Sequence, residues 1–437
     1  MNKTSRIIAA LVAVSAMGTA SAQQALKLSV DSMFSLLERN NTAIIAGKSQ
    51  VEVAERGIDV AKDARLPDID ASLQLSYIGN ALMTDRNFSN AKGLSSPHFG
   101  NALQVQVTQP VYAGGAINAG IKIAGISRDM AVTGTNITRN QARYGVLCQY
   151  LELYRIDNAI CVVDSNISLA QKLIEQINVK HSQGVALSND VTRYQVQLES
   201  LKLKRTTLAN RRRVACHQLC TSLGLESGTV IEPDKSVAEI ADVDATESTW
   251  QQQASQEALQ LKLSRLNEQL SSQQLRLARS QMLPSVALVA ANNFNGPFTY
   301  DLPPVDKNIN VWYVGVGVKY SLSSLYKGRR KVRQAEAALR QSRDATAQTA
   351  TAVDDAMQQA CVAYSQAQSE LATQKRQVQL ARQNYAVMND RYSNQLVLVT
   401  DMIDAANTML NAELLEVDAR IGIAQAYYSM KYVAGNL

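Results

Sequence analysis

Most of the chain repeats apolar residues at steps of three and four, the spacing that places them along one side of an α-helix. Two such series are Ile156, Ile160, Val163, Ile167, Ala170, Ile174 and Ile177, and Ile403, Ala406, Leu410, Leu414, Val417, Ile421 and Ala424. Proline inside a helix breaks it, and the spans 111–232 and 305–437 contain no proline. The pattern predicts long helices in both spans, with seams like those of coiled coils.

Four shorter segments place an apolar residue at every second position, which is the period of a β-strand. We predict strands at 68–77, 101–111, 285–294 and 311–321, of which 285–294 alternates least regularly. The alternation fits a half-buried sheet of a soluble protein, and it also fits a membrane barrel with one apolar face. Aromatic residues near the strand ends would supply a girdle at the membrane interface, which favours the barrel: Tyr77, Phe294, Trp312 and Tyr313.

The same signals recur in the same order in both halves of the chain. Leu-Pro precedes a strand at 66–67 and 283–284, glycine follows a second strand at 114–115 and 328, and an aspartate opens the last helix at 190 and 401. We therefore predict two tandem helix-strand-strand-helix-helix repeats, at 23–223 and 250–437. The linker 224–249 and the C-terminal tail 430–437 lack the repeat and are expected to wrap around the outside.

Four strands per chain are too few to close a membrane barrel, since about eight are needed and an open edge is not tolerated in lipid. A helix of about 67 residues would be about 100 Å long, whereas the bilayer core is about 30 Å thick. If the sheet lies in a membrane, the chain must form an oligomer, and its helices must reach far beyond the bilayer.

The first residues have the features of an export signal. Lys3 and Arg6 precede an apolar run at 7–17 and the small residues Ala20, Ser21 and Ala22. We predict a signal peptide at 1–22 that is cleaved after Ala22. The mature chain would then act outside the cytoplasm, so we expect no nucleic-acid partner for its modest formal net charge of +6.

No residue pattern in the chain supports an enzyme or a cofactor site. Cys216, His217 and Cys220 form the only cluster that resembles a metal site, but a structural zinc needs four ligands and no second Cys or His pair accompanies it. Cys148 and Cys161 are about 20 Å apart along a helix, too far for a disulfide. We expect no catalytic residue, no metal and no cofactor.

Several short motifs resemble those of the TolC-like outer-membrane efflux protein family over essentially the whole mature length. They are Ala64-Arg65-Leu66-Pro67, Thr108 to Gly115, Leu283-Pro284 and Tyr326 to Arg330. The resemblance implies a homotrimer with a 12-stranded barrel in the outer membrane and a 12-helix coiled-coil tunnel in the periplasm. It also implies a periplasmic adaptor (membrane fusion protein) and an inner-membrane pump as partners, in a tripartite efflux or type I secretion system.

The resemblance further implies a gate at the periplasmic end of the tunnel. Asp401 and Asp404 match the family's ring of aspartates, and Asp190 and Tyr392 match a pair that locks neighbouring helices. Asp190 and Asp401 also lie where helices begin, so capping of free N–H groups is an alternative for both. Tyr392 is equally compatible with a place in the core. The family's arginine just after the second helical tip is replaced here by Val397.

Adaptor docking is implied for two hairpin tips. Gly184, Val185 and Leu187 fit the family pattern at the first tip, and Leu396 lies at the second. The second tip lacks the usual glycine. A rival hypothesis is a periplasmic coiled-coil adaptor or scaffold, which predicts one helical hairpin inserted between halves of small β-domains. The tandem repeat argues against that rival.

Overall fold

The computed structural model describes residues 26–238, 246–298 and 305–437. The predicted signal peptide, 1–22, lies outside the described residues. The chain forms two compact units. Unit 1 takes in residues up to 46, 136–259 and 351–437, and unit 2 takes in 47–135 and 260–350. Helices α4 (Ala116–Ser182) and α8 (Ser324–Ser393) contribute residues to both units.

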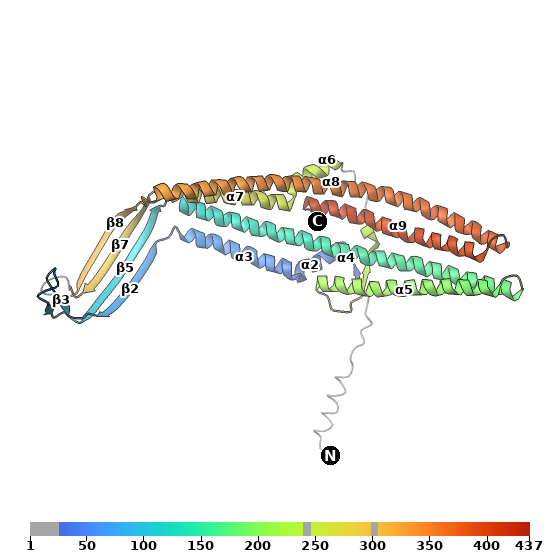
Figure 1. Ribbon diagram of the computed structural model, residues 1–437, viewed down its shortest axis with the longest axis horizontal. Helices are drawn as coiled ribbons and strands as arrows, with labels where there is room; N and C mark the ends of the chain where they lie inside the picture. Colours follow the sequence, from blue (N-terminus) through green and yellow to red (C-terminus); the bar gives the residue numbers. More distant parts are fainter. Residues whose placement is uncertain (1–25, 239–245, 299–304) are drawn as a thin grey trace, which may run out of the picture. The chain divides into compact units, whose positions relative to one another are not determined.

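Unit 2 contains an antiparallel four-stranded sheet with the order β2-β5-β7-β8 (Figure 1). Its strands are β2 (Asp68–Tyr77), β5 (Phe99–Tyr112), β7 (Ser285–Gly296) and β8 (Ile309–Lys319). They fall where the period-two pattern predicts strands, and each half of the sequence supplies two of them. The prediction of a mainly helical fold with a strand pair in each repeat is confirmed.

The register of the sheet separates an apolar face from a more polar one. Val107 lies opposite Ile69 on one side and Ala290 on the other, and Ala290 lies opposite Val314. Residues one position along the strands point to the other face. That second face carries Asp68, Thr108, Val289 and Gly315, which are aligned in the same way.

The aromatic residues near the loop end of the sheet divide between these faces. Trp312 pairs with Asn292 and lies on the apolar face, together with Phe294 and Tyr77. Tyr313 pairs with Ala291 and lies on the opposite face. The prediction that Tyr313 belongs to the same aromatic girdle is therefore wrong, because neighbouring residues of a strand cannot share a face.

The outer edges of β2 and β8 are not paired with another strand in the described part of the chain. Both are long strands, of 10 and 11 residues. Their apolar side chains are exposed, with Ile69 at 67% and Val314 at 71%. A small second hairpin, β3 (Ala81–Met83) with β4 (Lys92–Leu94), lies in the loop between β2 and β5.

The helical stretch before each strand pair is broken into two helices, where the predicted repeat has one. The first repeat has α2 (Val30–Asn40) and α3 (Thr42–Asp63), and the second has α6 (Glu247–Glu257) and α7 (Leu259–Ser280). Asn41 has an extended backbone, and its Oδ1 accepts from the N–H groups of Ala43 and Ile44 at 3.0 and 3.1 Å. Asn41 therefore caps the N-terminus of α3, and its extended backbone ends α2.

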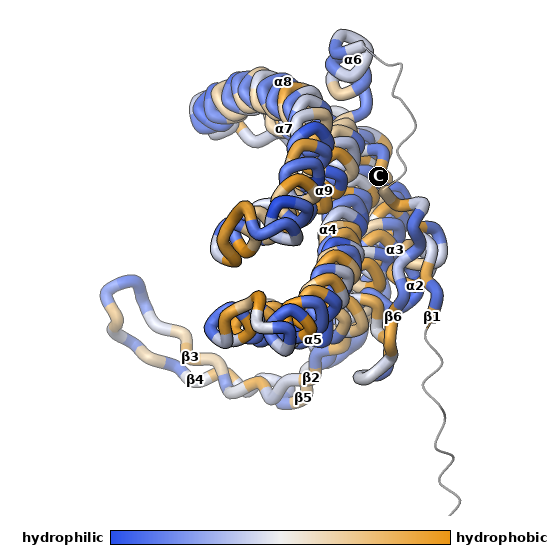
Figure 2. The backbone as a smooth tube through the Cα atoms, turned by 90° about the vertical axis from the view of Figure 1, so that its right-hand side faces the viewer, coloured by the Kyte–Doolittle hydropathy of each residue, from blue (hydrophilic) through white to orange (hydrophobic). Residues whose placement is uncertain are grey.

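Unit 1 contains two helical hairpins, formed by α4 with α5 (Ser188–Leu223) and by α8 with α9 (Val399–Ala434). Hydrophobic and hydrophilic residues alternate along these helices (Figure 2). Ion pairs join α5 to α4, with Arg205 Nε 2.6 Å from Asp164 Oδ1 and Arg212 Nε 2.5 Å from Asp157 Oδ1. Among the described residues, no helix is both long and apolar enough to cross a membrane.

The first described residues, the described part of the linker and the C-terminal tail pack onto these helices. β1 (Leu26–Leu28) pairs in parallel with β6 (Ile231–Pro233) of the linker. The buried Tyr150 of α4 bridges them, because its hydroxyl donates to the carbonyl of Leu28 and accepts from the N–H of Asp234. Helix α9 continues to Ala434, so most of the tail 430–437 is helical, and Asn436 donates to Glu257 Oε2 at 2.6 Å.

The turns at the two hairpin tips have the same backbone geometry. Gly184 has φ +75°, and the N–H of Val185 donates to the carbonyl of Lys180 at 2.9 Å. Gln395 has φ +62°, and the N–H of Leu396 donates to the carbonyl of Arg391 at 2.9 Å. Both helices thus end with a left-handed residue that lets a later N–H reach back into the last turn. The missing glycine does not change the second turn.

We expect Gly184→Ala to destabilise the first tip by about 1–2 kcal/mol, because a Cβ is strained in the left-handed region. Amide hydrogen exchange should become faster across 180–192. Gln395→Ala is the matched control, since that position already carries a Cβ, and exchange across 391–403 should stay nearly unchanged. An equal response at both tips would show that the glycine has no conformational role.

Candidate functional site

The predicted site residues lie at the two hairpin tips of unit 1. Val185 and Leu187 follow the turn between α4 and α5, and Leu396 and Leu398 occupy the matching places between α8 and α9. The apolar side chains are unusually exposed: Leu187, Leu396 and Leu398 are each about 71–72% exposed and Val185 is 48% exposed. The tips thus present apolar side chains to solvent, which is a common property of protein-binding surfaces.

Asp190 and Asp401 perform the same structural task in the first turn of α5 and of α9. Asp190 Oδ2 accepts from the N–H of Leu187 at 3.3 Å, and Asp401 Oδ2 accepts from the N–H of Leu398 at 3.0 Å. Each carboxylate satisfies a free N–H and places negative charge at the positive end of a helix. The capping alternative therefore holds for both residues. Capping uses only Oδ2 of each aspartate and leaves its other carboxylate oxygen for a further role.

Asp404 lies one turn into α9, three residues after Asp401, and both side chains are exposed. This spacing puts them on the same side of the helix. Capping does not account for Asp404, because a helix leaves only its first N–H groups unsatisfied. The two aspartates therefore form an exposed acidic pair at the start of α9.

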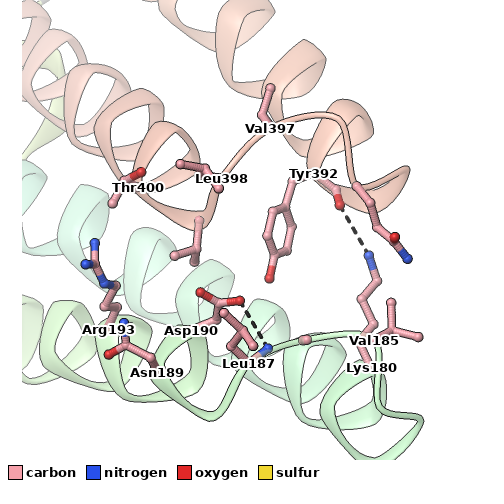
Figure 3. A pocket seen from close by; sticks show the side chains of 13 residues that line it. Lys180, Val185, Leu187, Asn189, Asp190, Arg193, Tyr392, Val397, Leu398 and Thr400 are labelled. Atoms are coloured by element: carbon pink, nitrogen blue, oxygen red, sulfur yellow. Dashed lines mark hydrogen bonds between the residues drawn. The ribbon is translucent and has the colours of Figure 1, made fainter.

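Tyr392 lies between the two hairpins and is 9% exposed. It packs with Ile177, Tyr194 and Met402 in a small hydrophobic cluster, so it is a core residue. Its hydroxyl also points toward the side of the pocket where Asp190 lies (Figure 3). Burial, and then the negative charge of Asp190, raise the pKa of Tyr392 above its ordinary value. The tyrosine therefore stays protonated and can serve as a hydrogen-bond donor.

A pocket of about 400 Å³ separates the tips of the two hairpins (Figure 3). Its lining includes Asp190, Tyr392, Val185 and Leu187, but not Asp401 or Asp404. The structure thus brings Asp190 and Tyr392 together, as predicted from the sequence, and keeps the acidic pair of α9 apart from them.

Lys180 connects the two hairpins across this pocket and is not predicted from the sequence. Its Nζ donates to the carbonyl of Ser393 at 3.0 Å and lies 5.1 Å from the ring centre of Tyr392. The carbonyl belongs to the last turn of α8, where a helix end attracts cations. A lysine in the last turn of α4 is a signal for such a contact, but the sequence does not reveal that the acceptor is on another helix.

Two more residues of the site are not predicted. Leu398 corresponds to Leu187 when 180–190 is aligned with 391–401, and this internal alignment would have identified it. Tyr194 is 1% exposed, and its hydroxyl has no hydrogen-bond partner in the described part of the chain. Val397 also lines the pocket, so no arginine is available at that position.

Further polar contacts attach α9 to the first hairpin at increasing distance from the tips. Gln197 donates to Asn407 at 2.6 Å, Asn166 donates to Glu413 Oε2 at 3.1 Å, and Arg155 pairs with Asp418 at 3.0 Å. Such bonds are individually modest and depend on the helices keeping their positions. With Lys180, they form a series of polar links between the two hairpins.

The cysteine cluster does not contain a metal-ligand set among the described residues. Cys216 and Cys220 are buried, and both thiols contact the carbonyl oxygen of Thr229, at 3.2 and 3.4 Å. Burial raises the pKa of Cys220 to about 11, so its thiol is protonated at neutral pH. The cysteines of the described chain are free.

Comparison with solved structures identifies the same fold in membrane channels. The outer membrane protein VceC from Vibrio cholerae is 14% identical, with a TM-score of 0.77 over 93% of this chain and 96% of its own. The outer-membrane channel OprN is 15% identical, with a TM-score of 0.78 and coverage of 93% and 90%. CusC is 12% identical, with a TM-score of 0.80 and coverage of 97% and 96%.

Comparison with curated protein sequences finds no match. The family model for outer membrane efflux proteins matches residues 33–225 and 250–436, one segment in each repeat. These matches cover most of the chain and agree with the tandem organisation of its helices and strands. The chain therefore belongs to the outer membrane efflux protein family.

Proposed function

We propose that three copies of this chain form the exit channel of a tripartite efflux or type I secretion system. The channel would close a 12-stranded barrel in the outer membrane and extend its helices into the periplasm. The observation that carries the proposal is the four-stranded sheet, which has one apolar face and two long unpaired edges among the described residues. Backbone groups at a free edge need partners in lipid, and neighbouring chains would supply them.

The order and direction of the strands suit such an arrangement. Adjacent strands in the sheet are antiparallel from β2 to β8, so β8 of one chain can pair antiparallel with β2 of the next. The apolar face would then form a continuous outer surface, and the face with Asp68 and Thr108 would line the lumen. The rival hypothesis of a periplasmic adaptor has little support, because it requires a single helical hairpin and the chain has two.

The acidic pair of α9 would form the gate. In a trimer, Asp401 and Asp404 would contribute six carboxylates around a constriction at the tunnel end, where they would attract cations. Asp190 and Tyr392, which lie together in the tip pocket, would hold the hairpins in the closed arrangement. No chemical reaction is required of the channel, since the inner-membrane pump would supply the energy.

Adaptor docking would take place at the tips, through Gly184, Val185, Leu187 and Leu396. The exposed leucines give the adaptor an apolar surface, and the turn at Gly184 keeps Val185 and Leu187 in place. An adaptor that binds the open arrangement more tightly would shift the population toward it. Docking and opening would thus be coupled through the same pocket.

We expect Asp401→Asn with Asp404→Asn to lower cation selectivity several-fold in single-channel recordings, and to weaken block by multivalent cations. The amide introduced at position 401 can still accept from the N–H of Leu398, so only the helix-dipole contribution of about 0.3–1 kcal/mol is lost. Thermal stability should therefore change little. Glu52→Gln with Glu55→Gln on α3 removes as many charges far from the tips along the sequence and serves as the control.

Tyr392→Phe tests the lock separately. Loss of the hydroxyl should favour the open state and raise basal conductance, while the ring still fills its place in the core. If the double aspartate variant and Tyr392→Phe both leave selectivity, block and conductance unchanged, the constriction is formed by other residues.

We expect Leu187→Glu with Leu396→Glu to reduce export to the level of a strain that lacks the channel, because a charged side chain opposes burial in an apolar interface. Assembly and membrane insertion should be normal, since both side chains are exposed. Gly184 is left intact to avoid backbone strain. Leu203→Glu, at a side chain that is 69% exposed on α5, is the control. Full export by the correctly inserted double variant would contradict the docking role.

A further inference from the structure

A basic stretch lies where the second strand pair of unit 2 passes into its long helix. Between Asp306 and Glu336 the sequence contains no acidic residue and seven cationic ones. Five of the seven fall within seven positions: Lys327, Arg329, Arg330, Lys331 and Arg333. No other seven-residue window of the described chain contains as many charges of one sign. None of these five residues belongs to the proposed gate or to the docking tips.

The stretch is unfavourable for the helix that contains it. Helix α8 begins at Ser324 and has no acidic residue in its first turn, and Lys327 lies in that turn, where a positive charge opposes the helix dipole. Several of the five cations lie three or four positions apart, and like charges at that spacing repel each other. The five side chains are exposed, and the contact of Lys331 Nζ with Gln281 Oε1 is long, at 3.4 Å. A stretch that costs stability in the free chain points to an anionic partner outside it.

The five cations lie on one broad side of α8. At 100° per residue they span about 200° of the helix circumference and leave an arc of about 160° without a cation. This arc contains Gly328, which is buried beside Met282, so the chain itself covers that side of the helix. The cations therefore lie on the sides of α8 that face away from this packed side.

Exposed apolar and aromatic residues lie next to the cations. Leu322, Leu325 and Tyr326 directly precede them and are 71%, 48% and 63% exposed. At the same end of the sheet, the other strand–helix junctions expose Leu66, Val111, Tyr112 and Leu283. Tyr112 pairs with Val286, so it continues the apolar face. Aromatic rings beside an apolar band, with cations beyond them, are the pattern of a membrane–water interface.

Acidic residues near this end of the sheet do not neutralise the outer surface. Asp68 and Asp70 alternate with Ile69 and Ala71, which places both carboxylates on the face opposite the apolar one. Glu336 lies one turn beyond the stretch and pairs with Arg279 at 2.9 Å. The apolar face therefore ends in net positive charge.

We propose that Lys327, Arg329, Arg330, Lys331 and Arg333 bind anionic phospholipid headgroups, such as phosphatidylglycerol, in the leaflet from which the helices emerge. The proposal rests on the proposed function, which puts the sheet in the outer membrane and the helices in the periplasm. Phospholipid is the source of the phosphate, because lipopolysaccharide of the outer leaflet would meet the opposite, loop end of the strands. The contact fixes the depth of the barrel and the level at which α8 leaves the membrane.

The test compares lipid binding to the purified full-length oligomer in neutral detergent. Phosphatidylglycerol or phosphatidylcholine is added, and bound lipids are counted by native mass spectrometry. The variant carries Arg329→Gln, Arg330→Gln and Lys331→Gln. The matched control, Lys204→Gln with Arg211→Gln and Arg213→Gln, removes three charges from α5 in unit 1.

We expect the wild type and the control to prefer phosphatidylglycerol. The variant should bind phosphatidylglycerol about ten- to a hundredfold more weakly, with phosphatidylcholine binding unchanged. An unaltered preference in the variant, or an equal loss in the control, would overturn the proposal. Stronger binding of a polyglutamate peptide than of phosphatidylglycerol would also overturn it, in favour of an acidic protein partner.

Conductance of the variant in planar bilayers separates this proposal from the proposed function. A variant that conducts normally and has lost its lipid preference supports both. A wild-type chain that neither assembles nor conducts defeats the proposed function, whatever its lipid binding. A conducting wild type without a lipid preference defeats only the inference drawn from the basic stretch.

Discussion

The unpaired edges of a four-stranded sheet are the constraint on which the rest of the structure depends. Strands β2 and β8 have an apolar face and, within the described chain, free backbone donors and acceptors along 10 and 11 residues. Lipid can cover the apolar face of the sheet. The N–H and C=O groups at its edges, however, need hydrogen-bond partners, and in lipid only another strand can supply them. The chain therefore specifies an incomplete structure, and the tandem repeat supplies strands in pairs whose directions allow closure by further copies.

The hairpin tips of the two repeats are stabilised by the same backbone contacts. Each tip ends α4 or α8 with a left-handed residue and starts the next helix with an aspartate that accepts an N–H. The turns therefore keep their shape through their own backbone contacts and can present exposed leucines. A small hydrophobic cluster around Tyr392 joins the two hairpins beside the tips, and polar links such as Lys180 to Ser393 add contacts that are individually modest. The proposed gate requires modest contacts, because opening must break them and closing must form them again.

Much of this architecture could be predicted from the sequence, because helices and strands here follow strict periods over long segments. Other features depend on tertiary contacts. The break at Asn41 arises from one side chain that caps the following helix. β7 alternates poorly because Val289 and Ala291 on its second face are also apolar. The left-handed Gln395 and the cross-hairpin contact of Lys180 are not visible in the sequence, since each depends on the geometry of a folded tip.

Electron cryo-microscopy of the full chain in lipid nanodiscs tests the central claim most directly, by showing what pairs with the two sheet edges. The account predicts a threefold assembly in which β8 of each chain pairs antiparallel with β2 of its neighbour, with Ile69 and Val314 on the outer surface. A particle in which either edge remains unpaired, or in which the apolar face lines the lumen, would contradict the account.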